Sequence, residues 1–172
     1  MEPHAAVTVI VGPQPAVLLI RRPVRATDPW SGQWALPGGR RQTSDATLLD
    51  TARRELAEEV GLHLSQNDSE NDSENDWTAL PTQVAGRHAG LSVLVAPYLC
   101  HLAHIPELRA DAREVAATYW LPLPFLDDPS HHHLGAVPGG GELEWPHFYV
   151  DGHPLWGFTY RVLTSWRLTL RA

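Results

Sequence analysis

Three glutamates fall within five residues of the stretch RRELAEEVGL, at Glu55, Glu58 and Glu59. On a helix, Glu59 lies about 40° from Glu55, and Glu58 lies about 60° away on the other side, so the three carboxylates share one arc. Like charges at these spacings repel each other, and the C-terminal end of a helix disfavours anions. A divalent cation such as Mg²⁺, which prefers carboxylate, water and phosphate oxygens, would offset this cost. The cluster is therefore either a metal site or a solvated helix end.

The residues around the cluster favour the metal site. Arg54 is four residues before Glu58 and offsets only part of the negative charge. The preceding segment LPGG, residues 36–39, places two glycines where backbone can approach a phosphate closely or offer a carbonyl oxygen to a metal. A glycine loop followed by an acidic helix thus combines the groups that a bound metal and a phosphate would need.

The helix that would carry these carboxylates is predicted over residues 46–60. Its apolar positions recur every three to four residues and form one buried stripe, at Leu49, Ala52, Leu56 and Val60. Ser44 or Asp45 is expected as the N-cap, and Gly61 is placed to end the helix in the left-handed conformation.

The rest of the chain predicts a sheet and a second helix. Two β-rich runs, Ala5–Val11 and Ala16–Arg21, flank a Gly-Pro turn and indicate a hairpin. Further strands are expected at residues 34–36, 79–84, 91–101 and 115–121, and an amphipathic helix is expected over 155–172.

The bulk properties describe one globular domain over residues 1–172. A formal charge of −7 disfavours binding to nucleic acid, which needs a basic surface. No apolar run approaches the roughly 20 residues of a membrane span, so a cytoplasmic protein without membrane contact is expected. Residues 63–77, which contain the sequence NDSE twice, are predicted to be a mobile polar loop inserted in the domain.

Segment 39–62 resembles the Nudix box, the loop–helix–loop motif of pyrophosphohydrolases written G-x5-E-x7-R-E-U-x-E-E-x-G-U, where U is aliphatic. The second half matches at every fixed position, from Arg54 to Leu62. In the first half, Asp45 stands five residues after Gly39 in place of glutamate, and eight residues rather than seven separate it from Arg54. This departure is similar to the coenzyme A pyrophosphatase branch of the family. It leaves open whether Asp45 pairs with Arg54.

The resemblance implies a fold and a set of roles. The fold would be an α/β/α sandwich, with a mixed sheet between helices and the catalytic helix on one face. Glu55 and Glu59 would bind Mg²⁺ or Mn²⁺, and Glu58 would be a further ligand or a base that orients water. The carbonyl of Gly39 would complete the metal shell, and Arg54 would orient the glutamates through charge-assisted hydrogen bonds.

Substrate contacts can also be sought outside the box, although ordinary packing or solvation is an alternative for each residue. Arginines before the glycine loop could bind phosphates, at Arg21, Arg22 and Arg25. Aromatic rings could stack on a base, at Trp30, Trp34 and Tyr98. Glu114 could supply a carboxylate from outside the box, or it could be a surface acid before a strand.

Three functions follow as hypotheses. The first is a coenzyme A or acyl-CoA diphosphatase. The second is a Nudix hydrolase of another nucleotide, such as a nucleotide sugar, ADP-ribose, a dinucleoside polyphosphate or a triphosphate. The third is a non-enzymatic nucleotide-binding regulator, which the retention of all three helix glutamates disfavours. The expected partner is a small nucleotide diphosphate, and the oligomeric state is open, with a dimer as one option.

Overall fold

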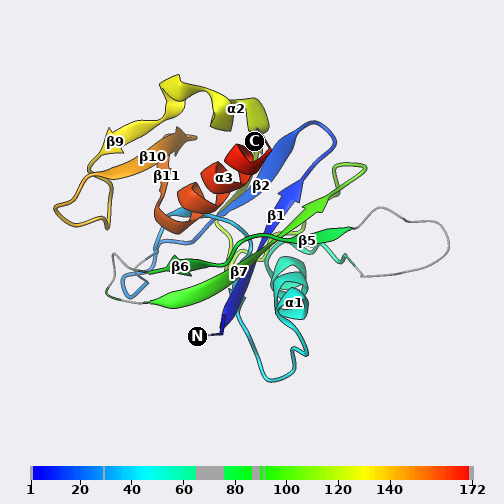
Figure 1. Ribbon diagram of the computed structural model, residues 1–172. Helices are drawn as coiled ribbons and strands as arrows, with labels where there is room; N and C mark the ends of the chain where they lie inside the picture. The colour runs from blue at the N-terminus through cyan, green and yellow to red at the C-terminus, as the bar shows by residue number, and fades with distance from the viewer. Residues whose placement is uncertain (1, 29, 65–75, 87–89, 91, 171–172) are drawn as a thin grey trace.

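The computed structural model describes residues 2–28, 30–64, 76–86, 90 and 92–170. Within these residues an eight-stranded mixed sheet forms the centre of the molecule (Figure 1). Its strands are β1 (Ala5–Val11), β2 (Ala16–Arg21), β3 (Trp34–Ala35), β4 (Gly38–Arg40), β5 (Trp77–Ala79), β6 (Gln83–Ala85), β7 (Val93–His101) and β8 (Ala117–Pro122). A second sheet of three strands contains β9 (His133–Gly135), β10 (Trp145–Val150) and β11 (His153–Trp156). The helices are α1 (Leu48–Val60), α2 (Leu123–Asp127) and α3 (Gly157–Thr169), with a short 3₁₀ turn, η2, at Pro129–His131.

The large sheet is mixed because β1 pairs in parallel with β7 and antiparallel with β2 and β4. The expected hairpin of β1 and β2 is confirmed. The single strand expected at residues 79–84 is instead two short strands, β5 and β6, both antiparallel to β7. Pro81 lies between them, and a proline cannot donate the hydrogen bond that would continue the ladder.

Helices cover both faces of the sheet, as expected for the α/β/α sandwich. Alternate residues of β1 and β2 point to opposite faces, because side chains on a strand alternate. One set, including Val9 and Leu19, packs in the core that contains Val162 and Leu163 of α3. The other set packs in the core that contains α1, and includes Ile10, Leu18 and Ile20 against Leu56 and Val60. Figure 1 shows α1 and α3 on either side of the central strands.

Helix α1 begins at Leu48, two residues later than predicted, because Thr47 is its N-cap. Thr47 and Asp50 form a reciprocal capping box in which each side chain accepts a hydrogen bond from the other residue's backbone N–H. The expectation of Ser44 or Asp45 as N-cap was wrong. The expected stop is confirmed, since Gly61 has φ 70° and its N–H donates to the carbonyl of Ala57 over 3.0 Å.

The C-terminal part differs most from expectation. Helix α3 begins at Gly157 rather than at residue 155, because Leu155 and Trp156 belong to β11. The small sheet of β9, β10 and β11 was not predicted. Both NDSE sequences lie within residues 65–75, outside the described residues, so the mobile loop stays a prediction, as does the single domain over 1–172. None of the helices in the described ranges is long and apolar enough to span a membrane, and the cytoplasmic location also stays a prediction.

Candidate active site

Asp45, which is buried, forms an ion pair with the half-buried Arg54 of α1. Arg54 donates from Nε and Nη2 to the two oxygens of Asp45, each over 3.0 Å. The same carboxylate accepts from the backbone N–H of Gln42 (2.9 Å) and from the Thr51 hydroxyl (3.0 Å). Arg54 therefore holds the pKa of the Asp45 carboxyl far below its usual range. Asp45 does pair with Arg54 despite its altered spacing.

Arg54 in turn orients two glutamates of its own helix. Its Nη1 donates to Glu55 and to Glu58, each over 2.9 Å, and its Nη2 donates to the carbonyl of Arg40 over 3.0 Å. Asp45 thus fixes the guanidinium from one side, and the guanidinium fixes the carboxylates on the other. Through these hydrogen bonds Arg54 can orient Glu55 and Glu58.

Three carboxylates converge beside this ion pair. Carboxylate oxygens of Glu55, Glu59 and Glu114 all lie within 4.8 Å of one another. Glu59 is buried and accepts one hydrogen bond, from the N–H of Gly38 over 2.9 Å. Burial raises the pKa of Glu59 to about 8, and burial also raises the pKa of Glu55. Arg54 pairs with Glu55, but among the described residues no ion pair joins a cation to Glu59 or Glu114. A divalent metal would relieve this imbalance of charge.

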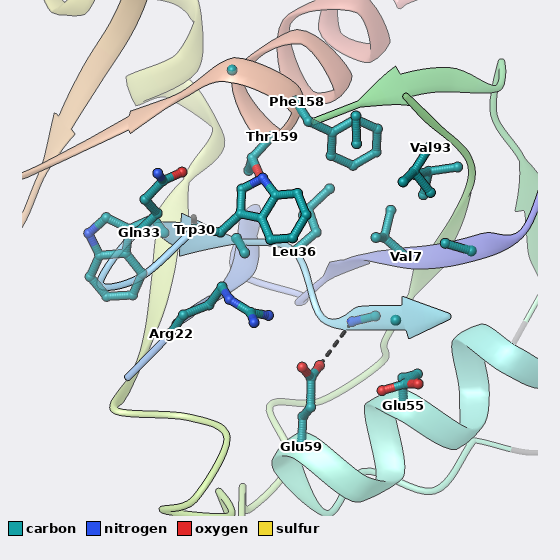
Figure 2. A pocket seen from close by; sticks show the side chains of 18 of the residues that line it. Val7, Arg22, Trp30, Gln33, Leu36, Glu55, Glu59, Val93, Phe158 and Thr159 are labelled. Atoms are coloured by element: carbon teal, nitrogen blue, oxygen red, sulfur yellow. Dashed lines mark hydrogen bonds between the residues drawn. The ribbon is translucent and has the colours of Figure 1, made fainter. Parts of the chain in front are cut away.

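The glycine loop brings backbone directly against the cluster. A Cβ on Gly39 would lie 2.4 Å from the carboxyl carbon of Glu55, and one on Gly38 would lie 2.3 Å from the carbonyl oxygen of Ala6. No side chain can occupy either position without displacing these groups. Figure 2 shows Glu55 and Glu59 rising from α1 toward this strand, β4.

Glu114 reaches the cluster because its loop closes the end of α1. The last carbonyls of a helix lack partners within the helix. The backbone N–H of Asp111 donates to the carbonyl of Glu59 (2.9 Å), and that of Arg109 donates to the carbonyl of Val60 (2.8 Å). Glu114 follows one turn later, with its N–H bonded to the Asp111 carbonyl over 2.9 Å. Helix capping therefore places a carboxylate that is distant in sequence next to Glu55 and Glu59.

A pocket of about 420 Å³ opens beside these carboxylates. Its apolar side comes from β1, the segment after β3, β7 and the start of α3, at Val7, Leu36, Val93, Val95 and Phe158. Its polar side includes Arg22, Gln33, Arg40 and Thr159 together with Glu55, Glu59 and Glu114 (Figure 2). A charged end and an apolar wall therefore meet in one cavity.

A model of the NUDIX domain matches residues 1–138 of this chain. The chain belongs to the Nudix family. The acidic helix, the glycine loop and the Asp45–Arg54 pair are therefore the Nudix box of this protein. The substitution of aspartate for glutamate in that box is compensated locally, because Asp45 still reaches Arg54 with both oxygens.

Proteins similar to this Nudix chain include two curated relatives. An uncharacterized protein of Schizosaccharomyces pombe, C14C4.10c, is 38% identical over 111 residues, which are 63% of this chain and 32% of that protein. The human mitochondrial coenzyme A diphosphatase NUDT8 is 29% identical over 160 residues, 92% of this chain and 64% of that protein. The chain thus spans about a third of the first relative and less than two thirds of the second.

Among solved structures, the NUDIX domain of Shewanella oneidensis NrtR, solved in complex with ADP ribose, has a TM-score of 0.65. It is 19% identical, and the match covers 99% of this chain and 89% of that one. The likeness confirms the mixed α+β Nudix fold.

Of the four metal ligands that the resemblance implied, three lie at the carboxylate cluster and one, Glu58, lies outside it. Glu55 and Glu59 share the carboxylate cluster, and Gly39 lies against Glu55. Glu58 is outside the cluster; its side chain is 50% exposed and bonded to Arg54. The arc that the three glutamates share on α1 therefore divides between the pocket and the surface, and a ligand or base role for Glu58 stays a prediction.

Only some of the candidate substrate contacts line the pocket. Trp34 lines it but is 2% exposed, and its indole N–H donates to the carbonyl of Val150 over 2.8 Å, which indicates packing. Arg21 and Arg25 are not in the lining. Arg21 bonds His153 over 2.9 Å, and the Arg25 guanidinium donates to the carbonyl of Arg113.

Arg22 and Trp30 do line the pocket, whereas Tyr98 does not. Phe158 and Thr159 of α3 also line the pocket. The sequence did not indicate this, because the C-terminal helix was predicted only to pack on the sheet. The alternation of side chains along a strand could have distinguished Arg22 from Arg21 in the sequence. Alternation along β2 sends Arg21 and Arg22 to opposite faces of the sheet, and Arg22 falls on the face of α1.

Proposed function

We propose that this Nudix chain is a metal-dependent diphosphatase that hydrolyses a nucleoside-diphosphate-X linkage, with coenzyme A or acyl-CoA as its substrate. The observation that carries this proposal is the cluster of Glu55, Glu59 and Glu114 at one end of a pocket of about 420 Å³. Three carboxylates this close together, one of them the buried Glu59, repel one another and are costly for folding alone, so the cluster fits a binding role.

The residues of the cluster suit Mg²⁺ or Mn²⁺. All of the side-chain donors are carboxylate oxygens, which hard divalent cations prefer. Glu55, Glu59 and Glu114 would hold the cation, with the carbonyl of Gly39 as a further donor. When bound there, a divalent cation would lower the pKa of a coordinated water and stabilise negative charge on the phosphates.

The remaining steps belong to the chain's own residues. Arg54, locked by Asp45, keeps the carboxylate of Glu55 in place. The N–H of Gly38 holds the Glu59 carboxylate toward the glycine loop. Glu58 would accept the proton of the attacking water. The water oxygen joins phosphorus as the bridging P–O bond breaks, and coenzyme A would yield a phosphopantetheine product and adenosine 3′,5′-bisphosphate.

Three observations support coenzyme A over other nucleotides. The box spacing resembles the coenzyme A pyrophosphatase branch, and a relative 29% identical over 92% of this chain is named a coenzyme A diphosphatase. The pocket is also suited to a substrate with a charged bridge and a less polar arm, because the carboxylates and Arg22 adjoin a wall of valine, leucine and phenylalanine side chains.

A substrate panel tests this function. Coenzyme A, acyl-CoAs, ADP-ribose, nucleotide sugars and nucleoside triphosphates would each be incubated with Mg²⁺ or Mn²⁺, using wild type and Glu59→Gln. We expect metal-dependent turnover of coenzyme A or an acyl-CoA that the variant lacks. Turnover of another nucleotide without turnover of coenzyme A would replace the substrate in this proposal, and a wild type inert on the whole panel would favour a binding protein.

A further inference from the structure

Two arginines are among the described residues that line the pocket, Arg22 and Arg40. Arg22 follows the last residue of β2, and its backbone N–H continues the ladder by donating to the carbonyl of Gln33 over 3.0 Å. Alternation places Arg22 on the same face as Leu18 and Ile20, which is the face of α1 and its glutamates. Figure 2 shows the Arg22 side chain directed into the pocket, on the side of Glu59.

Asp28 holds this guanidinium in place. Its Oδ2 accepts from Arg22 Nε over 3.0 Å and from Arg22 Nη2 over 2.7 Å. Its Oδ1 accepts from the backbone N–H of Trp30 over 3.0 Å, and its own backbone carbonyl accepts from the N–H of Ser31 over 3.0 Å. One carboxylate therefore fixes both the arginine and the turn that carries Trp30, another residue of the pocket lining.

The ion pair with Asp28 uses only some of the hydrogen-bond donors of Arg22. A guanidinium has five N–H donors in a planar fork. Asp28 takes two of them, and within the described part of the chain no acceptor is bonded to the Nη1 group. The Asp28 side chain is 13% exposed and that of Arg22 is 33% exposed, so the anchoring carboxylate is largely covered while Arg22 stays accessible from the pocket. A planar pair of N–H donors facing an acidic metal site matches a phosphate, which would bring the acceptor oxygens.

We propose that Asp28 is a positioning residue that holds Arg22 as the ligand of a bridging phosphate of the substrate. Arg22 donates from its free Nη1 edge to a phosphate oxygen, while the metal site binds the same bridge from the side of α1. The assignment rests on the proposed function for the identity of the substrate, but not for the phosphate contact itself.

The first experiment measures the phosphate contact without turnover. Imidodiphosphate, whose P–N–P bridge resists hydrolysis, is titrated calorimetrically into wild type, Arg22→Gln and Arg109→Gln in saturating Mg²⁺. Arg109 is a matched control, because its loss removes the same charge from a side chain that is 79% exposed and outside the lining. We expect Arg22→Gln to raise the Kd about 10- to 100-fold, as for loss of a charge-assisted hydrogen bond, and Arg109→Gln to change it less than about two-fold.

The second experiment tests the positioning role through a double-mutant cycle. Asp28→Asn alone should raise the imidodiphosphate Kd about five-fold, and it should add nothing in the Arg22→Gln background, because it acts through Arg22. A residue that served only to hold the loop would lower the melting temperature equally in both backgrounds and leave the Kd unchanged.

Each outcome decides the assignment. A wild type that does not bind imidodiphosphate, an unchanged Kd in Arg22→Gln, or additive effects in the cycle would overturn it. If Arg22→Gln weakens the binding of coenzyme A alone, and leaves the binding of dephospho-coenzyme A and imidodiphosphate unchanged, the assignment is also overturned. Arg22 would then contact the 3′-phosphate rather than the bridging phosphate. If coenzyme A is not a substrate but imidodiphosphate binding depends on Arg22 and Asp28, the proposed function fails and this inference stands.

Discussion

Asp45 and Glu59 are two buried carboxylates beside the same helix, and their environments are opposite. They are similarly buried, at 7% and 3% exposure. Asp45 accepts from four donors, two of them on Arg54, and its pKa is lowered by that arginine. Glu59 accepts from one backbone N–H, lies beside Glu55 and Glu114, and has a pKa raised to about 8 by burial. Burial alone therefore does not decide the charge state of an acid; its donors do.

The two environments indicate different roles for the two acids, one in the stability of the protein and one in binding a cation. The charge of Asp45 is already compensated by the chain, so Asp45 contributes to the stability of the loop–helix–loop motif. The charge of Glu59 is not compensated, so it is available to a cation from solution. If this comparison is right, neutralising each acid should affect different properties of the protein.

The largest effect is expected for Glu59→Gln. Loss of a metal ligand should reduce kcat/KM by about 10³-fold or more, which corresponds to about 4 kcal/mol of transition-state stabilisation. Steady-state kinetics at saturating Mg²⁺ would measure it. Glu107→Gln is the control, because Glu107 is an exposed acid outside the pocket. Retention of more than a tenth of the activity in Glu59→Gln would place the metal elsewhere.

The next effect is expected for Asp45→Asn, and it should appear in stability. This variant removes the carboxylate that accepts two hydrogen bonds from the half-buried Arg54 guanidinium, which keeps Glu55 and Glu58 as charged partners. The loss of these two charge-assisted hydrogen bonds should cost about 3 kcal/mol of unfolding free energy. For a chain of this size that cost lowers the melting temperature by about 10 °C. Thermal and urea unfolding with and without Mg²⁺ would measure it. A melting temperature within about 2 °C of wild type would show that the pair is dispensable.

The pH dependence of stability sharpens the comparison further. Glu59 has a folded pKa of about 8, above its ordinary value of 4.5, so its contribution to stability is complete below pH 4.5 and is lost as pH rises through 8. We expect the metal-free protein to lose about 2 to 3 kcal/mol between about pH 5.5 and 8 from this group. Glu59→Gln should remove that slope. Asp45, with its lowered pKa, should lose its contribution only in acid.

Urea unfolding in a chelator at several pH values would measure these slopes. Parallel pH profiles for wild type and Glu59→Gln would contradict the assignment of the slope to Glu59.

The smallest effect is expected for Gly39→Ala, which changes no charge. The added methyl group would lie 2.4 Å from the carboxyl carbon of Glu55 and push that side chain from the cluster. Metal affinity should fall about ten-fold, a cost of about 1.4 kcal/mol. Gly135→Ala is a matched control, because its Cβ would have its nearest neighbour at 3.8 Å. Equal Mg²⁺ affinity in both variants would show that the cluster can rearrange freely.

Much of the fold could be predicted because its signals are local. The apolar stripe of α1, Gly61 and the β1–β2 hairpin each depend on a few neighbouring residues. The N-cap was missed because several polar residues before α1 compete for it. Of the two that were expected, Ser44 and Asp45, the carboxylate of Asp45 is instead paired with Arg54. In the small sheet, β10 and β11 are joined by the two residues Asp151 and Gly152, both with positive φ, which is a local hairpin signal that was overlooked. Strand β9 gave no such signal, because it is short and an irregular segment separates it from β10.

The site divides in the same way. The box glutamates were identified from spacing, but spacing alone does not show that Glu58 lies outside the cluster that Glu55 and Glu59 share. Glu114 joins the cluster through a loop that bonds the last turn of α1, and no local pattern around residue 114 reports such a contact. The preference for Arg22 over Arg21 and Arg25 required the direction of side chains at the end of β2.

The central claim is that the uncompensated carboxylates bind a divalent metal. Titration of Mn²⁺, followed by the electron paramagnetic resonance signal of the free ion, tests it directly in wild type, Glu59→Gln, Asp45→Asn and Glu107→Gln. The titration would be run at about pH 8, where Glu59 is about half ionised. We predict saturable binding that Glu59→Gln weakens by about ten-fold or more and that Glu107→Gln leaves unchanged, with Asp45→Asn between them. Equal Mn²⁺ affinity in wild type and Glu59→Gln would contradict the account.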